Sequence, residues 1–251
     1  MNRVSKLGFT IVELMLAMGF VSALLLAIAM TVIQISNIYT KGITYTNVNK
    51  EGAAIANELQ KSIAEVKKFS VEPILLDPNT KFINNPESGR LCTGKYSYVW
   101  NYGHYQQTYG ANYIKYQGFT PANSPKVFFV KVYDPNFLVC IKSGVPLAYP
   151  DIIQASATEL LNASQAGSQF DLAIHYFTIA SPSSASDNNT GQQLYNIQFF
   201  IGTNDQTGSG TLTYAGASPP TCKISGIDSN PLYCAVTQFD ITARAGSSTN
   251  E

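Results

Sequence analysis

The sequence has little charge and few histidines. Only 13% of its 251 residues are Asp, Glu, Lys or Arg, about half the share usual in a soluble globular protein, and 16 basic residues balance 16 acidic ones. Because a balanced, charge-poor chain has no basic field to follow phosphates, the composition argues against nucleic acid as a main partner. Intrinsic disorder is excluded for most of the length, since 45% hydrophobic and 12% aromatic residues are enough to build a core.

Catalytic signatures are also missing. The two histidines, His104 and His175, lie in different segments, and there is no HExxH, GxSxG, Walker A or dinucleotide-binding glycine pattern. The apolar neighbours of His175 indicate that it lines a strand. We therefore expect no enzyme and no cofactor, and we assign no metal site. A loop calcium site built from Asp187, Asn188, Asn189 or Asp205 stays a weak alternative, because its spacing is not that of an EF-hand. A secreted hydrolase that uses His175 is the least favoured class.

Most of the N-terminal part is one long uncharged segment. Between Leu14 and Thr40 there are 27 consecutive residues without a charge. A helix of that length is about 40 Å long, more than the thickness of a hydrocarbon core, so the segment predicts a membrane span. Arg3 and Lys6 precede it with no acid among the first twelve residues. This positive charge predicts a cytoplasmic N-terminus and an outward-facing remainder.

Two ordinary interpretations of the span are a cleaved secretory signal and a plain N-terminal anchor. A signal would be cut after Ala29, yet the apolar run continues to Ile35. Glu13 stands at the head of the run, where a carboxylate is costly and needs a partner. A plain anchor would gain nothing from it.

A third interpretation explains the carboxylate through the sequence Lys6-Leu7-Gly8-Phe9-Thr10-Ile11-Val12-Glu13-Leu14. This stretch closely resembles the class III signal of type IV prepilins and type II secretion pseudopilins. The resemblance implies that a prepilin peptidase cuts after Gly8 and that the new N-terminal Phe9 is N-methylated. It also implies that Glu13 pairs with the N-terminal amine of a neighbouring subunit during filament assembly. Burying two opposite charges together satisfies both and sets the register.

The same resemblance names the partners. They are other pilin or pseudopilin subunits, the prepilin peptidase, an inner-membrane assembly platform and, before assembly, the lipid bilayer. Most major pilins carry a proline at mature position 22, which falls on Met30 in this chain. By resemblance, that difference favours a minor pilin or minor pseudopilin.

Helical periodicity continues beyond the span. Small or apolar residues recur every three or four positions: Ile38, Gly42, Tyr45, Val48, Gly52, Ile55, Leu59, Ile63 and Val66. Charged residues occupy the opposite face, where Glu58–Lys61 and Glu65–Lys68 are i,i+3 pairs. One helix over about residues 9–69 is predicted, with Gly42 and Gly52 as its softest points and the stripe packed on the following domain.

The outer part predicts an α+β fold, with the long helix packed on an antiparallel sheet. Strands are expected at Lys95–Tyr102, Lys126–Tyr133, Phe137–Lys142, Phe170–Ile179, Leu194–Ile201 and Val236–Arg244, and a short helix at Ile152–Ala166. The chain is thus divided into a leader (1–8), a membrane or filament-core helix (9–35), its amphipathic continuation (36–70) and an extracellular β-rich head (71–251).

All four cysteines lie in this outer part. Four cysteines allow three pairings, of which Cys92–Cys140 with Cys222–Cys234 is favoured because the second pair closes a short loop rich in turn residues. Free buried thiols remain an alternative. A metal site is weak, because there is no CxxC pair and no histidine cluster.

Aromatic residues crowd the segment 96–116. There are eight in 21 residues: Tyr96, Tyr98, Trp100, Tyr102, Tyr105, Tyr109, Tyr113 and Tyr116. Five of them, Tyr98, Trp100, Tyr102, Tyr105 and Tyr109, are candidates for an exposed binding face, because Tyr and Trp dominate contact hot spots. The favoured alternative is a strand face and loop packed on the helix, with phenol hydroxyls reaching water.

Two functions are carried forward. The first is a prepilin-like subunit, held in the cytoplasmic membrane with its head outside and then assembled into a cell-surface pilus or secretion pseudopilus. The second is a permanently anchored extracellular binding protein or adhesin, with the aromatic segment as its site.

Overall fold

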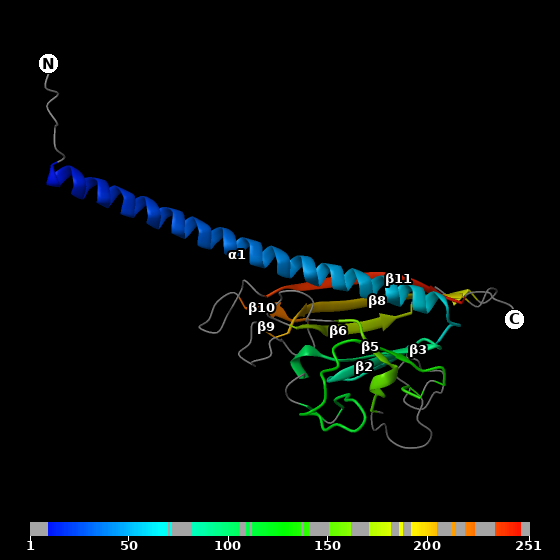
Figure 1. Cartoon of the computed structure of the whole chain (residues 1–251). Helices are drawn as coiled ribbons and strands as arrows, with labels where there is room; N and C mark the ends of the chain where they lie inside the picture. The colour runs from blue at the N-terminus through cyan, green and yellow to red at the C-terminus, as the bar shows by residue number, and fades with distance from the viewer. Residues whose placement is uncertain are drawn as a thin grey trace, which may run out of the picture.

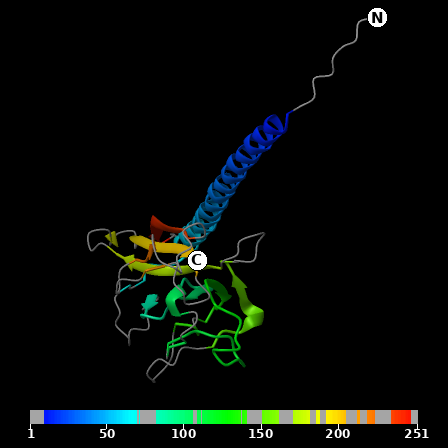
Figure 2. The same cartoon turned by 90° about the vertical axis from the view of Figure 1, so that its left-hand side faces the viewer.

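The computed structural model confirms the α+β prediction. It describes residues 10–69, 71, 82–105, 109–110, 112–136, 138–140, 151–161, 171–181, 186–187, 192–204, 212–213, 219–223 and 234–246. One long helix, α1, runs out of a head built from antiparallel sheets (Figure 1). In the perpendicular view the N-terminal half of α1 projects away from the head as a single arm (Figure 2).

Helix α1 spans Ile11–Ala64, and its 54 residues give a length of about 81 Å. It therefore ends five residues before the predicted Phe69: Glu65 is its C-cap, and the N–H of Glu65 bonds the carbonyl of Ile63. The helix is continuous through both of the glycines expected to soften it. A Cβ at Gly52 would lie closer than 3.0 Å to three ring atoms of Phe239, so this glycine makes room for a packing contact.

The first sheet is a five-stranded antiparallel meander in chain order. Its strands are β1 (Phe82–Asn84), β2 (Ser88–Cys92), β3 (Tyr96–Asn101), β4 (Val130–Tyr133) and β5 (Ala157–Glu159). The β2–β3 hairpin turns at Gly94, whose φ of 108° favours glycine, and the N–H of Thr93 bonds the carbonyl of Tyr96.

The second sheet has the strand order β11-β8-β6. It is formed by β6 (Leu172–Ala180), β8 (Gln192–Thr203) and β11 (Val236–Ala245), with the short β7 (Ser186–Asp187) beside β8. A separate pair joins β9 (Leu212–Thr213) to β10 (Thr221–Cys222). Two 3-10 turns, η1 (Gly103–Tyr105) and η2 (Gln154–Ser156), complete the described elements.

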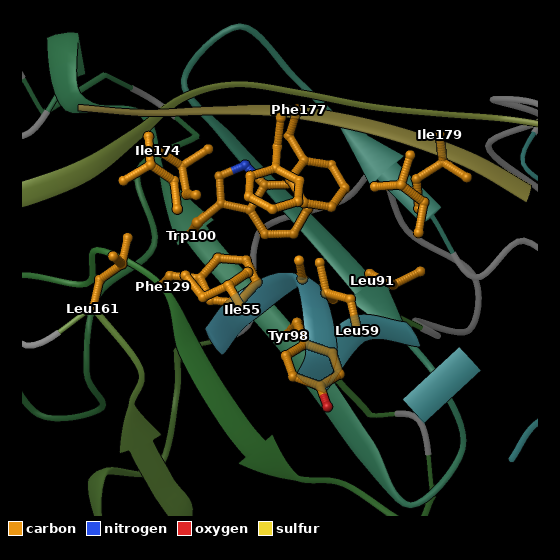
Figure 3. Close-up of a cluster of buried hydrophobic side chains, with 14 of the residues drawn as sticks. Ile55, Leu59, Leu91, Tyr98, Trp100, Phe129, Leu161, Ile174, Phe177 and Ile179 are labelled. Carbon is orange, nitrogen blue, oxygen red and sulfur yellow. The ribbon is translucent and has the colours of Figure 1, made fainter. Parts of the chain in front are cut away.

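The core lies where α1 and the two sheets meet. Figure 3 shows Ile55 and Leu59 of α1 pointing toward Trp100 of β3 and its neighbours. The rings of Trp100 and Phe177 are 4.4 Å apart between centroids, and both side chains are fully buried. A single cluster of aromatic and aliphatic side chains therefore packs the C-terminal part of α1 against the two sheets.

Several predicted elements are wrong. The helix expected at Ile152–Ala166 is replaced by η2 and β5 as far as residue 161, and residues 162–170 lie outside the described ones. The reason is tertiary: the Glu159 carboxylate accepts the N–H groups of Phe128 and Phe129, which holds β5 beside β4. Residues 138–140 form a turn where a strand was expected, because the Asp134 carboxylate accepts the N–H groups of Leu138 and Val139.

Candidate assembly surface

The N-terminal half of α1 is an uncovered apolar surface. Every residue from Thr10 to Ser36 is exposed, and the most apolar 18-residue window has a mean hydropathy of 2.5 with none of it buried. The helix is long and apolar enough to cross a membrane. Its large exposed side chains include Leu14, Met15, Phe20, Leu24, Leu25, Ile28, Val32 and Ile35. A surface of this size needs lipid or another protein as its cover.

Glu13 closes a capping box at the start of α1. The Glu13 carboxylate accepts hydrogen bonds from the backbone N–H and the hydroxyl of Thr10, both at 2.9 Å, while the Glu13 N–H donates to Thr10 Oγ1 at 3.3 Å. This corrects the expectation that an anchor gains nothing from Glu13, because within a single chain the carboxylate satisfies the N–H of the N-cap residue Thr10. Gly8 and Phe9, the predicted processing residues, lie outside the described ones.

The head covers only the C-terminal third of α1. Of the predicted stripe, Val48, Gly52, Ile55, Leu59 and Ile63 are buried. The earlier members of the stripe are not, so the head begins to pack at about residue 48. The uncharged segment of the helix therefore ends before the segment that the head covers begins, and the two do not overlap.

Polar contacts also fasten the head to α1. The Glu58 carboxylate accepts from Lys131 Nζ at 2.5 Å and from the Tyr98 hydroxyl at 2.8 Å. Burial by itself raises the pKa of Glu58, but these hydrogen bonds outweigh it and leave that pKa below its ordinary value. Lys61, the partner expected on the same helix, attracts the Glu58 carboxylate more weakly than Lys131 does. The contacts with Lys131 and Tyr98 show that Glu58 faces the sheet.

The prediction of an exposed aromatic binding face is wrong for Tyr98, Trp100 and Tyr102. Tyr98 and Trp100 are 0% exposed and Tyr102 is 7% exposed, all within the core. Tyr105 packs against the same core from its edge. Tyr109 is half-buried and its ring meets Tyr113 edge-on at 5.1 Å. These five residues therefore do not form one exposed surface, and the packing alternative describes them.

Two disulfides fasten the head. Cys92 pairs with Cys140 and Cys222 with Cys234, with Cα–Cα distances of 6.2 and 5.8 Å, which is the pairing favoured from the sequence. No cysteine is left free. The first bond ties the end of β2 to the turn at residues 138–140, and the second ties β10 to the start of β11.

Two titratable groups of the head are His175, which is buried, and Glu159, which is partly buried. His175 sits in β6, as expected, at the point where the pairing with β8 shifts register; its Nε2 lies 3.2 Å from the Thr203 carbonyl, and burial lowers its pKa to about 4. Burial also raises the pKa of Glu159 to about 7, although backbone N–H groups partly stabilise the carboxylate. Across the described ranges no three His, Cys, Asp or Glu side chains gather as a metal site would require.

No protein-family model, no curated protein and no solved structure matches the chain. Its function is therefore inferred from its own residues.

Proposed function

We propose that this chain is a prepilin-like structural subunit, of the minor kind, of a type IV pilus or a type II secretion pseudopilus. It is cut after Gly8, methylated on Phe9 and held in the cytoplasmic membrane with its head outside. The helix then leaves the bilayer and joins the filament core. Its partners are the peptidase, the assembly platform and other pilin-like subunits.

The observation that carries the proposal is that α1 has an exposed apolar N-terminal half and a C-terminal third that the head covers. A helix that is apolar all round and uncovered over residues 10–36 needs an outside cover. In this account the cover is lipid at first and neighbouring helices afterwards. The two disulfides suit a head that functions outside the reducing cytoplasm.

Glu13 has a different partner in each state. In the single chain its carboxylate is held by Thr10, and both residues remain after a cut at Gly8. In the filament we expect the carboxylate to turn to the N-terminal amine of a neighbouring subunit, because a carboxylate and an ammonium buried together neutralise each other. The capping box therefore stabilises the acid during its time in the membrane.

A permanently anchored extracellular binding protein is the second candidate. It is favoured by the same capping box, which gives Glu13 a role that requires no second subunit. In that case the acid is needed for helix geometry and not for its charge.

Three substitutions separate the two candidates in cells that make the filament. Glu13→Gln keeps an oxygen that can accept from Thr10 but removes the charge, Glu13→Ala removes both, and Thr10→Ala removes the cap alone. Under the proposal all three variants insert into the membrane. The incorporation of both Glu13 variants into sheared filaments falls about tenfold or more. A tenfold fall corresponds to a loss of about 1.4 kcal/mol in the free energy of assembly. Thr10→Ala incorporates nearly normally.

A permanently anchored protein gives a different result, because the unchanged chain itself then stays in the membrane fraction and is absent from the sheared filaments. If Glu13→Gln enters filaments as well as the unchanged chain while Thr10→Ala does not, the charge has no part in assembly. Incorporation is measured by immunoblot of the sheared fraction against the membrane fraction.

A further inference from the structure

A cleft of about 480 Å³ opens between the end of α1 and the β2–β3 turn. This volume is within the range of sites for small ligands. Ser62 and Thr93, both buried, belong to its lining, and their hydroxyl oxygens lie 2.7 Å apart. One wall is the C-terminal end of α1, and the other is the β2–β3 hairpin, whose Cys92 is bonded to Cys140.

The lining of the cleft is basic in a chain that has little charge. Lys67, Lys68 and Lys95 line it, all three exposed, together with the single acid Glu65. The two ion pairs found among the described residues, Lys115–Asp151 and Lys131–Glu58, do not use any of these three lysines. The carbonyl end of α1 adds only about half a negative charge. Among the residues that line the cleft, three lysines outweigh one glutamate and the helix end, which favours an anion.

Tyr96 is the one tyrosine among the described residues that line the cleft. Its ring has Lys131 Nζ 4.0 Å and Lys95 Nζ 5.5 Å from the centroid, and Tyr133 meets it edge-on at 5.9 Å. These contacts hold the ring in place at the side of a basic opening. An aromatic ring can stack on the C–H face of a sugar, while a flexible acidic peptide would need only the charges.

The position of the cleft argues against a lipid headgroup as the anion. Its helical lining begins at Ser62, 22 residues beyond the end of the uncharged segment at Thr40, which is about 33 Å along the axis. That distance places the opening well outside the headgroup layer if α1 stands in a membrane. This last step rests on the proposed function, whereas the charge and shape of the cleft do not.

We propose that the cleft binds an acidic saccharide. The sugar carboxylate lies against Lys67, Lys68 and Lys95, and the sugar ring lies against Tyr96. The site is separate from the assembly surface on the N-terminal half of α1, so a subunit can carry both functions.

The test is a titration of the purified full-length chain, in nonionic detergent, with a trimer of galacturonate, followed by calorimetry at low salt. We expect saturable binding that weakens as salt is added. The combined variant Lys67→Gln, Lys68→Gln and Lys95→Gln should bind about tenfold or more weakly, because each lost charge contact removes part of the attraction. Tyr96→Leu should weaken binding as well. Lys50→Gln, an exposed lysine of α1 away from the cleft, is the matched control and should bind normally.

Three results would overturn the proposal. The first is no heat and no shift of the unfolding temperature with the galacturonate trimer. The second is an equal loss for Lys50→Gln, which would mean that overall charge alone attracts the sugar. The third is binding of a glutamate-rich peptide or of inorganic phosphate as tight as that of the trimer. Because the assay uses the unassembled chain, none of these results bears on filament formation.

Discussion

The ring of Phe239 on β11 occupies the space that a side chain at Gly52 on α1 would need. The contact lies on the side of the helix that the head covers, where α1 and β11 run together (Figure 1). It explains why this position of the helix is a glycine in spite of that residue's poor helix propensity.

Gly52→Ala should therefore destabilise the head, while Gly42→Ala should not. A Cβ at Gly42 meets nothing within 4 Å, so that variant is the matched control. Both gain the same helix propensity, and the difference between them reports overpacking against Phe239, about 1–3 kcal/mol. Denaturant unfolding followed by tryptophan fluorescence measures it, since the single Trp100 lies in the core. Equal stabilities of the two variants would contradict the contact.

His175 and Glu159 should act on stability in opposite directions over the same pH interval. Glu159 has a folded pKa of about 7 against an ordinary 4.5, so it favours folding when protonated, and that gain is lost as the pH rises from about 4.5 to 7. His175 has a folded pKa of about 4 against 6.5, so its contribution is present above pH 6.5 and is lost as the pH falls toward 4. Their contributions largely cancel in the unchanged chain.

Single substitutions should reveal each group. Glu159→Gln should make stability fall on acidification from pH 7 to 4, because the His175 contribution is then no longer offset by that of Glu159. His175→Gln should make stability rise over the same interval. For each variant the free energy of unfolding should change by at most ~3 kcal/mol between pH 7 and pH 4. Unfolding in urea at half-unit pH steps measures both, and parallel pH profiles for the two variants would show that the opposite signs are wrong.

The two disulfides should differ in their contributions. Cys92 and Cys140 are 48 residues apart, and Cys222 and Cys234 are 12 apart. In the loop-entropy description the longer closure constrains the unfolded chain by about 1 kcal/mol more. Replacing Cys92 and Cys140 with serine should therefore lower the free energy of unfolding by more than replacing the other pair. The reverse order would mean that native-state packing, not loop length, decides the effect.

The sequence predicted α1 and the long strands β6, β8 and β11, because their apolar residues recur with a clear period of three to four or of two. It missed β2, whose Ser88 and Gly89 resemble turn residues. Those two positions are strand-like only in the fold: the Ser88 hydroxyl donates to the Asn112 carbonyl, and Gly89 pairs with Trp100, whose ring fills the space that a Cβ would need. Such contacts join residues far apart in the chain, and no local pattern records them.

The candidate site was predicted unevenly for a similar reason. Glu13 was evident from the sequence as the one acid before an apolar run, but its bond to Thr10 is a geometric fact. Tyr98 and Trp100 alternate as in a strand with one open face, and yet the structure covers both faces of β3. The basic cleft was missed altogether, because Lys67 and Lys95 come together only when the β2–β3 turn meets the end of α1.

The mass of the mature N-terminus tests the central claim most directly. The chain is purified from cell envelopes of a cell that expresses it with its assembly machinery, and its N-terminal peptide is sequenced by mass spectrometry. The account predicts a peptide that begins with N-methylated Phe9. A chain that still begins at Met1, or that begins at Met30 after a cut behind Ala29, would contradict it.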